Sequence, residues 1–152
     1  MSDYGLRIVV DNKIDAVVSI LDDALRAEGM APMAHIDVRE QFARELSHDF
    51  RRYVLVHAWS PELARDALRH SLDVATVLPA AIAVYELADG ETVVVANRPF
   101  APFEDDYQWR AASPVLATIA DREIQRLARV IDRIVKVAPC KGRVDVMALA
   151  RA

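Results

Sequence analysis

The side chains best suited to chemistry lie on two short segments of this chain, where they recur at every second residue. These candidates are His35 and Asp37 on the first segment, and Tyr53, His57 and Trp59 on the second. If both segments are neighbouring β-strands, the alternation places the two sets on one face of a sheet. Imidazoles, a carboxylate, a phenol and an indole would then share one surface. Such a mixture of apolar walls and a few polar anchors is typical of a small-molecule site.

The residues between these candidates support the same interpretation. They are small and aliphatic, and we expect them to face the helices: Ala34, Ile36, Val38, Val54, Val56 and Ala58. Met33 and Leu55 join the candidate face by the same alternation. On a later strand Tyr85 is a further candidate ligand-binding residue, and its neighbour Glu86 must point the opposite way.

Three functions fit this surface. The first is a non-catalytic binding or interaction protein for a small apolar or aromatic ligand. The second is an acid-base enzyme, a hydrolase or lyase, in which His57 and Asp37 must come within hydrogen-bond reach. We expect a homodimer, and the third function is a purely structural one in which this face is the dimer interface, because Tyr, Trp and Met are enriched at such interfaces. Two histidines without a third ligand do not define a metal site, so neither a metal nor another cofactor is predicted.

Other classes of function find little support in the sequence. The serines Ser60 and Ser113 each precede a proline and are explained as helix N-caps, and Cys140 lies near the end of the chain, so no nucleophile is paired with a base. The four glycines form no phosphate-binding loop. With a formal charge of −4 the chain also lacks the basic field that attracts nucleic acid.

The composition predicts one domain with an aliphatic core. The 152 residues are too few for two ordinary domains, and 53% are hydrophobic while only 7% are aromatic. A single cysteine forms no internal disulfide, which fits a reducing compartment. Without a signal peptide or about 20 consecutive apolar residues, no membrane association is predicted, and we expect a cytoplasmic protein.

Periodicity and turn signals predict an α+β fold, with a curved antiparallel sheet of about four to six strands backed by helices. The expected strands are Leu6 to Val10, Pro32 to Val38, Tyr53 to Trp59, Ala81 to Leu87 and Thr92 to Asn97. The expected helices are Lys13 to Ala27, Arg39 to Leu46, one from Ser60-Pro61 to Ser71, and a long C-terminal helix from Ser113-Pro114 to Pro139.

The connections complete this prediction. Asp89-Gly90 signals a hairpin turn between the last two strands. The stretches before Pro79 and from Arg98 to Ala112 are expected to be loops. We take residues 1–138 as a single α+β domain and residues 139–152 as a tail, which either frays or forms a short helix over Val144 to Ala150.

Several short motifs resemble the family known as domain of unknown function family 302. They are Ala58-Trp59-Ser60-Pro61, Leu78-Pro79-Ala80 and Val84-Tyr85-Glu86 with Asp89-Gly90, preceded by Ala27-Glu28-Gly29-Met30 and His35-Ile36-Asp37-Val38. The resemblance covers about residues 5 to 100. It implies a single-copy relative of the TATA-binding-protein fold that is commonly dimeric, and it implies no biochemical activity.

The chain departs from that family at two positions that bear on chemistry. Many members carry a cysteine where this chain has Trp59, and another where it has Ala80. An indole and a methyl group are neither soft metal ligands nor nucleophiles. Thiol or metal chemistry of such members therefore does not carry over to this chain.

Overall fold

The chain folds into a six-stranded antiparallel sheet whose strand order is β2-β3-β4-β5-β1-β6. We describe a computed structural model, in which residues 5–87 and 90–141 are defined. The strands are β1 (Leu6–Val10), β2 (Ala31–Asp37), β3 (Tyr53–Trp59), β4 (Ala80–Glu86), β5 (Thr92–Ala96) and β6 (Cys140–Lys141). The helices are α1 (Ile14–Ala27), α2 (Val38–Leu46), α3 (Pro61–His70), α4 (Tyr107–Ala112) and α5 (Pro114–Val137), with 3-10 turns η1 (Leu72–Thr76) and η2 (Ala101–Phe103).

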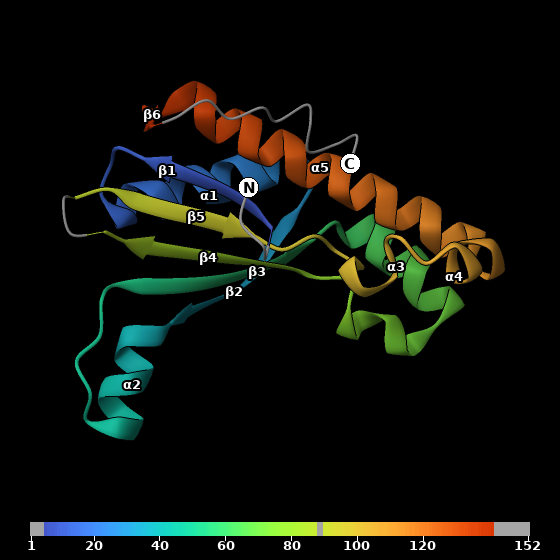
Figure 1. Cartoon of the computed structure of the whole chain (residues 1–152), viewed down its shortest axis with the longest axis horizontal. Coiled ribbons are helices and arrows are strands. Elements are labelled where there is room, and N and C mark those ends of the chain that lie inside the picture. Colours follow the sequence, from blue (N-terminus) through green and yellow to red (C-terminus); the bar gives the residue numbers. More distant parts are fainter. Residues whose placement is uncertain (1–4, 88–89, 142–152) are drawn as a thin grey trace.

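The predicted α+β class, the antiparallel sheet and the long C-terminal helix are confirmed. Helices α1 and α5 lie on one face of the sheet, as Figure 1 shows, while α2 extends away from the body of the protein. After α1, Gly29 adopts a left-handed conformation with φ of 72° and accompanies the hydrogen bond from Met30 N to Leu25 O. This is the glycine stop that the sequence predicts.

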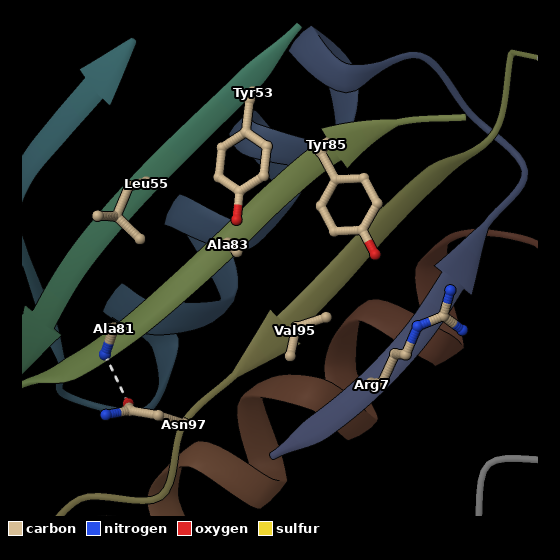
Figure 2. A pocket seen from close by; sticks show the side chains of 8 residues that line it. All are labelled: Arg7, Tyr53, Leu55, Ala81, Ala83, Tyr85, Val95 and Asn97. Carbon is tan, nitrogen blue, oxygen red and sulfur yellow. Dashed lines mark hydrogen bonds between the residues drawn. The ribbon is translucent and has the colours of Figure 1, made fainter. Parts of the chain in front are cut away.

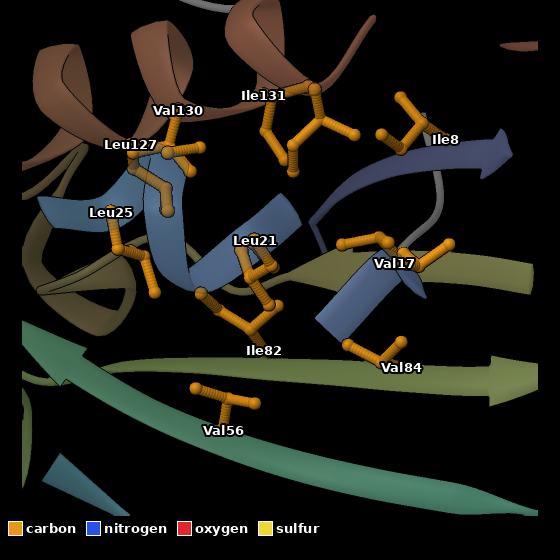
Figure 3. Close-up of a cluster of buried hydrophobic side chains, with 14 of the residues drawn as sticks. Ile8, Val17, Leu21, Leu25, Val56, Ile82, Val84, Leu127, Val130 and Ile131 are labelled. Atoms are coloured by element: carbon orange, nitrogen blue, oxygen red, sulfur yellow. The ribbon is translucent and has the colours of Figure 1, made fainter. Parts of the chain in front are cut away.

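The main core fills the space between the sheet and helices α1 and α5. Side chains from the two layers interlock there, as Figure 3 shows. They include Ile8, Val17, Leu21, Leu25, Val56, Ile82, Val84, Leu127, Val130 and Ile131. Nearly all are aliphatic, as the composition predicts, and each buried side chain of this size contributes about 1.5–3 kcal/mol.

A second, smaller core lies beyond the end of β3. It joins α3 and η1 to the N-terminal half of α5 through Leu63, Ala64, Ala67, Val74, Leu78, Phe100, Ile119 and Ala120. Trp59 and Trp109 both pack against it. Tryptophan fluorescence therefore reports on the integrity of this core.

The starts of α3 and α5 are predicted correctly, but the expected capping bonds are absent. Neither Ser60 nor Ser113 makes a side-chain cap hydrogen bond, and each helix begins with its proline. At Ser60 the backbone N–H donates instead to Glu123 Oε1 at 3.0 Å. The backbone at this position thus makes a tertiary contact with α5.

Two connections that were expected to be loops contain short helices. Asp106 caps α4 by accepting a hydrogen bond from Trp109 N at 2.9 Å, and η1 occupies the stretch before Pro79. In the predicted tail, Cys140–Lys141 forms β6 beside β1, whereas the possible helix at 144–150 lies outside the described residues. Of the predicted hairpin turn Asp89-Gly90, Asp89 lies outside them as well, whereas Gly90 is left-handed with φ of 77°. Leu87 N donates to Glu91 O at 2.7 Å.

None of the described helices combines the length and the apolar character needed to cross a bilayer.

Glu28, at the end of α1, ties the two covering helices together. Its carboxylate accepts hydrogen bonds from Arg129 Nε at 2.6 Å and from Arg133 Nε at 2.5 Å, both on α5. Burial opposes ionisation of this carboxyl, but the two guanidinium hydrogen bonds outweigh it and lower the pKa of Glu28. A carboxyl whose pKa is lower in the folded than in the unfolded chain stabilises the fold at pH values above the ordinary glutamate pKa. This stabilisation is lost as the pH falls through the folded pKa.

We therefore expect Glu28→Gln to lower the free energy of unfolding by about 1–3 kcal/mol at pH 7. The loss should shrink below about pH 4.3, where glutamate also becomes protonated in the unfolded chain. Urea unfolding followed by tryptophan fluorescence at several pH values measures it. Glu45→Gln, which disrupts the exposed pair with Arg44, is the control and should cost under about 0.5 kcal/mol. Equal losses in the two variants would contradict this role of Glu28.

Glu123 is a fully buried carboxyl on α5. Among the described residues, Ser60 Oγ and Glu123 Oε2 have no hydrogen-bond partner. Burial raises the pKa of Glu123, and the hydrogen bond from Ser60 offsets only part of this effect. A carboxyl with a raised folded pKa favours folding at low pH and costs stability as pH rises through that value.

Glu123→Gln should therefore be more stable than the wild type at pH 8, with the difference vanishing near pH 4. The amide keeps an acceptor for Ser60 N–H but has no charge to bury. Urea unfolding of the wild type and of Glu123→Gln, followed by tryptophan fluorescence at several pH values, measures this difference in stability. Glu62→Gln is the control, because Glu62 is exposed on α3. A wild type whose advantage over Glu123→Gln grows with pH would refute the assignment.

Candidate functional site

The face of the sheet away from α1 and α5 carries a hollow, and strand pairing decides which residues line it. Directly opposite residues in antiparallel strands lie on the same face. One row across the face runs from Leu55 through Ala83 and Val95 to Arg7, on β3, β4, β5 and β1 in turn. This row supplies an apolar floor with one cationic end.

Two tyrosines form one end of the hollow. Tyr53 and Tyr85 are paired across β3 and β4, and their rings stack with centroids 5.4 Å apart and planes 10° from parallel. Both rings stand over the sheet in Figure 2. Burial, and to a smaller extent the neighbouring Tyr85, raise the pKa of Tyr53. This phenol is therefore neutral at physiological pH and can donate a hydrogen bond.

Asn97 forms the other end of the hollow. Its side-chain Oδ1 accepts a hydrogen bond from Ala81 N at 2.6 Å, and its backbone N donates to Ala81 O at 3.0 Å. The carboxamide thus continues the ladder between β4 and β5. Its NH₂ group stays available as a donor toward a ligand, since no described residue accepts from it.

The hollow has a volume of about 380 Å³, which falls at the small end of the usual range for ligand sites. Its lining consists of Arg7, Tyr53, Leu55, Ala81, Ala83, Tyr85, Val95 and Asn97. Four of these eight are aliphatic, and none is an acid, a histidine, a serine or a cysteine. The polar groups of the lining are thus the Arg7 guanidinium, the two phenols and the Asn97 carboxamide.

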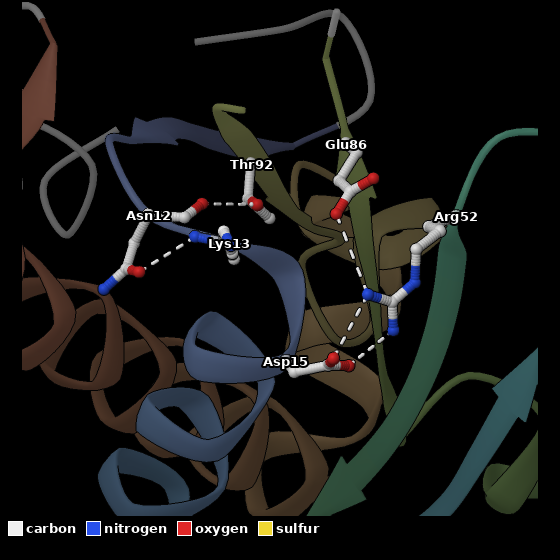
Figure 4. A network of polar contacts seen from close by, with 6 residues as sticks. All are labelled: Asn12, Lys13, Asp15, Arg52, Glu86 and Thr92. Carbon is white, nitrogen blue, oxygen red and sulfur yellow. Dashed lines mark hydrogen bonds and ion pairs between the residues drawn. The ribbon is translucent and has the colours of Figure 1, made fainter. Parts of the chain in front are cut away.

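A polar network fixes the tyrosine end of the sheet. Arg52, just before β3, donates to both carboxylate oxygens of Asp15 at the start of α1, at 2.5 and 3.1 Å, and lies 3.8 Å from Glu86 (Figure 4). The hydrogen bond from Arg52 lowers the pKa of Asp15. Nearby, Thr92 Oγ1 donates to Asn12 O at 2.8 Å. These contacts hold the ends of β3, β4 and β5 against the first turn of α1.

The predicted placement of His35 and Asp37 is wrong. A bulge between Pro32 and Ala34 inserts one extra residue into β2, which reverses the alternation after it. His35 consequently pairs with Val56 on the helix-covered face, where its Nε2 lies 2.9 Å from Asp22 Oδ1 on α1. Asp37 pairs with Val54 and caps α2 by accepting from Glu40 N at 2.9 Å.

The same bulge removes the proposed acid-base pair. His57 lies on the open face opposite Ala34 and Ala81, whereas Asp37 lies on the covered face opposite Val54. Three residues along β3 separate the two positions, which is about 10 Å. The hydrolase or lyase interpretation that used His57 and Asp37 is therefore wrong.

Three other placements follow from the bulge and the strand ends. Ala34 and Ile36, predicted to face the helices, lie on the open face opposite His57 and Leu55, and Val38 is the first residue of α2. Trp59 packs against the second core and does not line the hollow. Of the six predicted site residues, Tyr53 and Tyr85 line the hollow, and His57 lies beside it.

Sequence reasoning missed four lining positions besides Arg7: Ala81, Ala83, Val95 and Asn97. The sequence does indicate that Arg7 lies on the open face. The apolar residues Leu6, Ile8 and Val10 alternate with Arg7 and Val9 along the first strand. No local pattern reveals that β1 lies next to β5, which is what brings Arg7 to the hollow. Among the described residues, no group of three or more His, Cys, Asp or Glu side chains is arranged to hold a metal ion.

Comparison with known proteins identifies the family. Residues 6–134 match the family model described as Domain of unknown function DUF302. The chain belongs to this family. Its fold is similar to that of an uncharacterized conserved DUF302 protein from Bacillus stearothermophilus, with a TM-score of 0.71 and 24% sequence identity over 88% of this chain and 99% of the other. No curated protein matches the chain. Membership in DUF302 thus accounts for the fold and assigns no activity.

Proposed function

We propose that the hollow on the open face binds a small, flat, largely apolar molecule, and that the protein works as a binding protein without catalysis. The stacked pair of Tyr53 and Tyr85 carries this proposal. Paired rings beside an aliphatic floor offer a planar ligand a large contact area. The polar groups at the rim, from Arg7 and Asn97, can orient it.

The effect of Tyr85→Ala on binding of a neutral aromatic probe, 2-methoxynaphthalene, tests this proposal. Titration of isotope-labelled protein should perturb the amide resonances of β3, β4 and β5 around the hollow. Losing one ring should raise the Kd roughly 2- to 10-fold. Tyr107→Ala is the matched control, because Tyr107 is 83% exposed on α4 and away from the hollow. Perturbation elsewhere, or equal effects of both variants, would refute the proposal.

A second candidate is self-association through the same face. Helix α2 has no buried residue and extends from the body, and a nine-residue helix is marginal without packing. Beside it, Ile36 on β2 is 39% exposed and continues the apolar row through Leu55. A second copy covering α2 and this row would bury both features in a homodimer.

Ile36→Glu should then convert a dimer into a monomer in analytical ultracentrifugation, because a carboxylate in the centre of an apolar interface is left without a partner. Val137→Glu is the control. Val137 is also an exposed apolar residue, at 68%, but it lies on α5 on the covered side of the sheet. A wild type that sediments as a monomer at all concentrations would exclude this candidate.

A further inference from the structure

We propose that the ligand of the hollow is a flat aromatic or acyl carboxylate, and that Arg7 binds its anionic group. This inference rests on the proposed binding function and adds the chemical class of the ligand. Three observations support it: the position of Arg7 beside the apolar floor, the absence of an ion pair between Arg7 and any described acid, and the hydrogen-bond donors around the hollow.

Arg7 lies at the β1 end of the row that forms the apolar floor. Its direct partner on β5 is Val95, which pairs in turn with Ala83 on β4. Two strand spacings, about 10 Å, therefore separate the Arg7 backbone from the strand that carries Tyr85. Figure 2 shows the Arg7 side chain running along β1 toward the Tyr85 end of the hollow. A molecule of two fused rings with a terminal carboxylate fits such a span.

The charge of Arg7 is not neutralised within the described residues. Arg52, Arg129 and Arg133 each pair with a carboxylate, but no described acid forms an ion pair with Arg7. Arg7 is also the only residue of the eight in the lining with a formal charge at neutral pH. A guanidinium stays protonated at every physiological pH and binds a carboxylate through two parallel N–H donors. The hollow therefore offers a permanent anion-binding group beside an apolar floor.

The remaining polar groups of the lining favour the same ligand class. The hydroxyls of Tyr53 and Tyr85 can donate hydrogen bonds, as can the NH₂ group of Asn97. The carbonyl oxygen of Asn97 already accepts from Ala81 N. With several donors and no anionic side chain in the lining, the hollow suits a ligand rich in acceptors and disfavours a cation.

Binding of 2-naphthoate and of its neutral analogue 2-naphthamide tests the inference, since the two share the same rings. Chemical-shift titrations of the labelled full chain at low ionic strength give both Kd values. We expect the wild type to bind 2-naphthoate about 10-fold more tightly than 2-naphthamide, as a charge-assisted hydrogen bond allows. Arg7→Gln should abolish this preference without weakening binding of the amide. Added salt should reduce the preference in the wild type.

Two further variants separate the possible outcomes. Arg122→Gln removes the same charge from an exposed position on α5 and should keep the preference. Tyr85→Ala should weaken both probes equally. Equal affinity of the wild type for the two probes, or a preference that survives Arg7→Gln, would overturn the role of Arg7 and leave the proposed binding function standing. Failure of both probes to perturb the hollow would overturn the two proposals together.

Discussion

The burial of one face of the sheet against α1 and α5 is the constraint on which the rest of the structure depends. Side chains alternate along a strand, so committing Val56, Ile82 and Val84 to the core also commits their neighbours to the open face. Antiparallel pairing then carries this choice from strand to strand. Leu55, Ala83, Val95 and Arg7 come together because each lies opposite the next, although they come from four separate parts of the sequence. The candidate site is thus a consequence of how the core is packed.

Helix α5 makes this arrangement possible because it serves both cores. Its middle turns place Leu127 and Ile131 over the sheet, while its first turns place Ile119 and Ala120 in the second core with α3. Two carboxylates attach other elements to it. Glu28 accepts from two α5 arginines and secures α1, and Glu123 accepts from Ser60 where β3 passes into α3. The open face carries no comparable layer among the described residues, so the hollow proposed as a binding site stays accessible.

Much of the architecture could be predicted from local patterns. The strand Tyr53–Trp59, the glycine stop after α1 and the proline starts of α3 and α5 each depend on residues that are adjacent or one turn apart. The site was predicted less well. Strict alternation through β2 places His35 and Asp37 on the wrong face, because a bulge at Met33 interrupts it. Pro32 is the local signal for this bulge, since strands accept proline chiefly at edges and bulges. Alternation along β3 places Trp59 in the site, but its indole packs against the second core. From the end of the strand the indole can reach α3 and η1.

The sequence by itself therefore determined most of the secondary structure, the aliphatic core and the α+β class, since periodicity and helix-end signals act over a few residues. Tertiary structure decided the strand order, the bulge register and the partners of each charged group. Those features depend on contacts between residues far apart in the chain, and a register shift of one residue exchanges the two faces of a strand without changing its pattern. For this reason Tyr53 and Tyr85 were recognised as candidates from their own strands. Arg7 joined them only when β1 was placed beside β5.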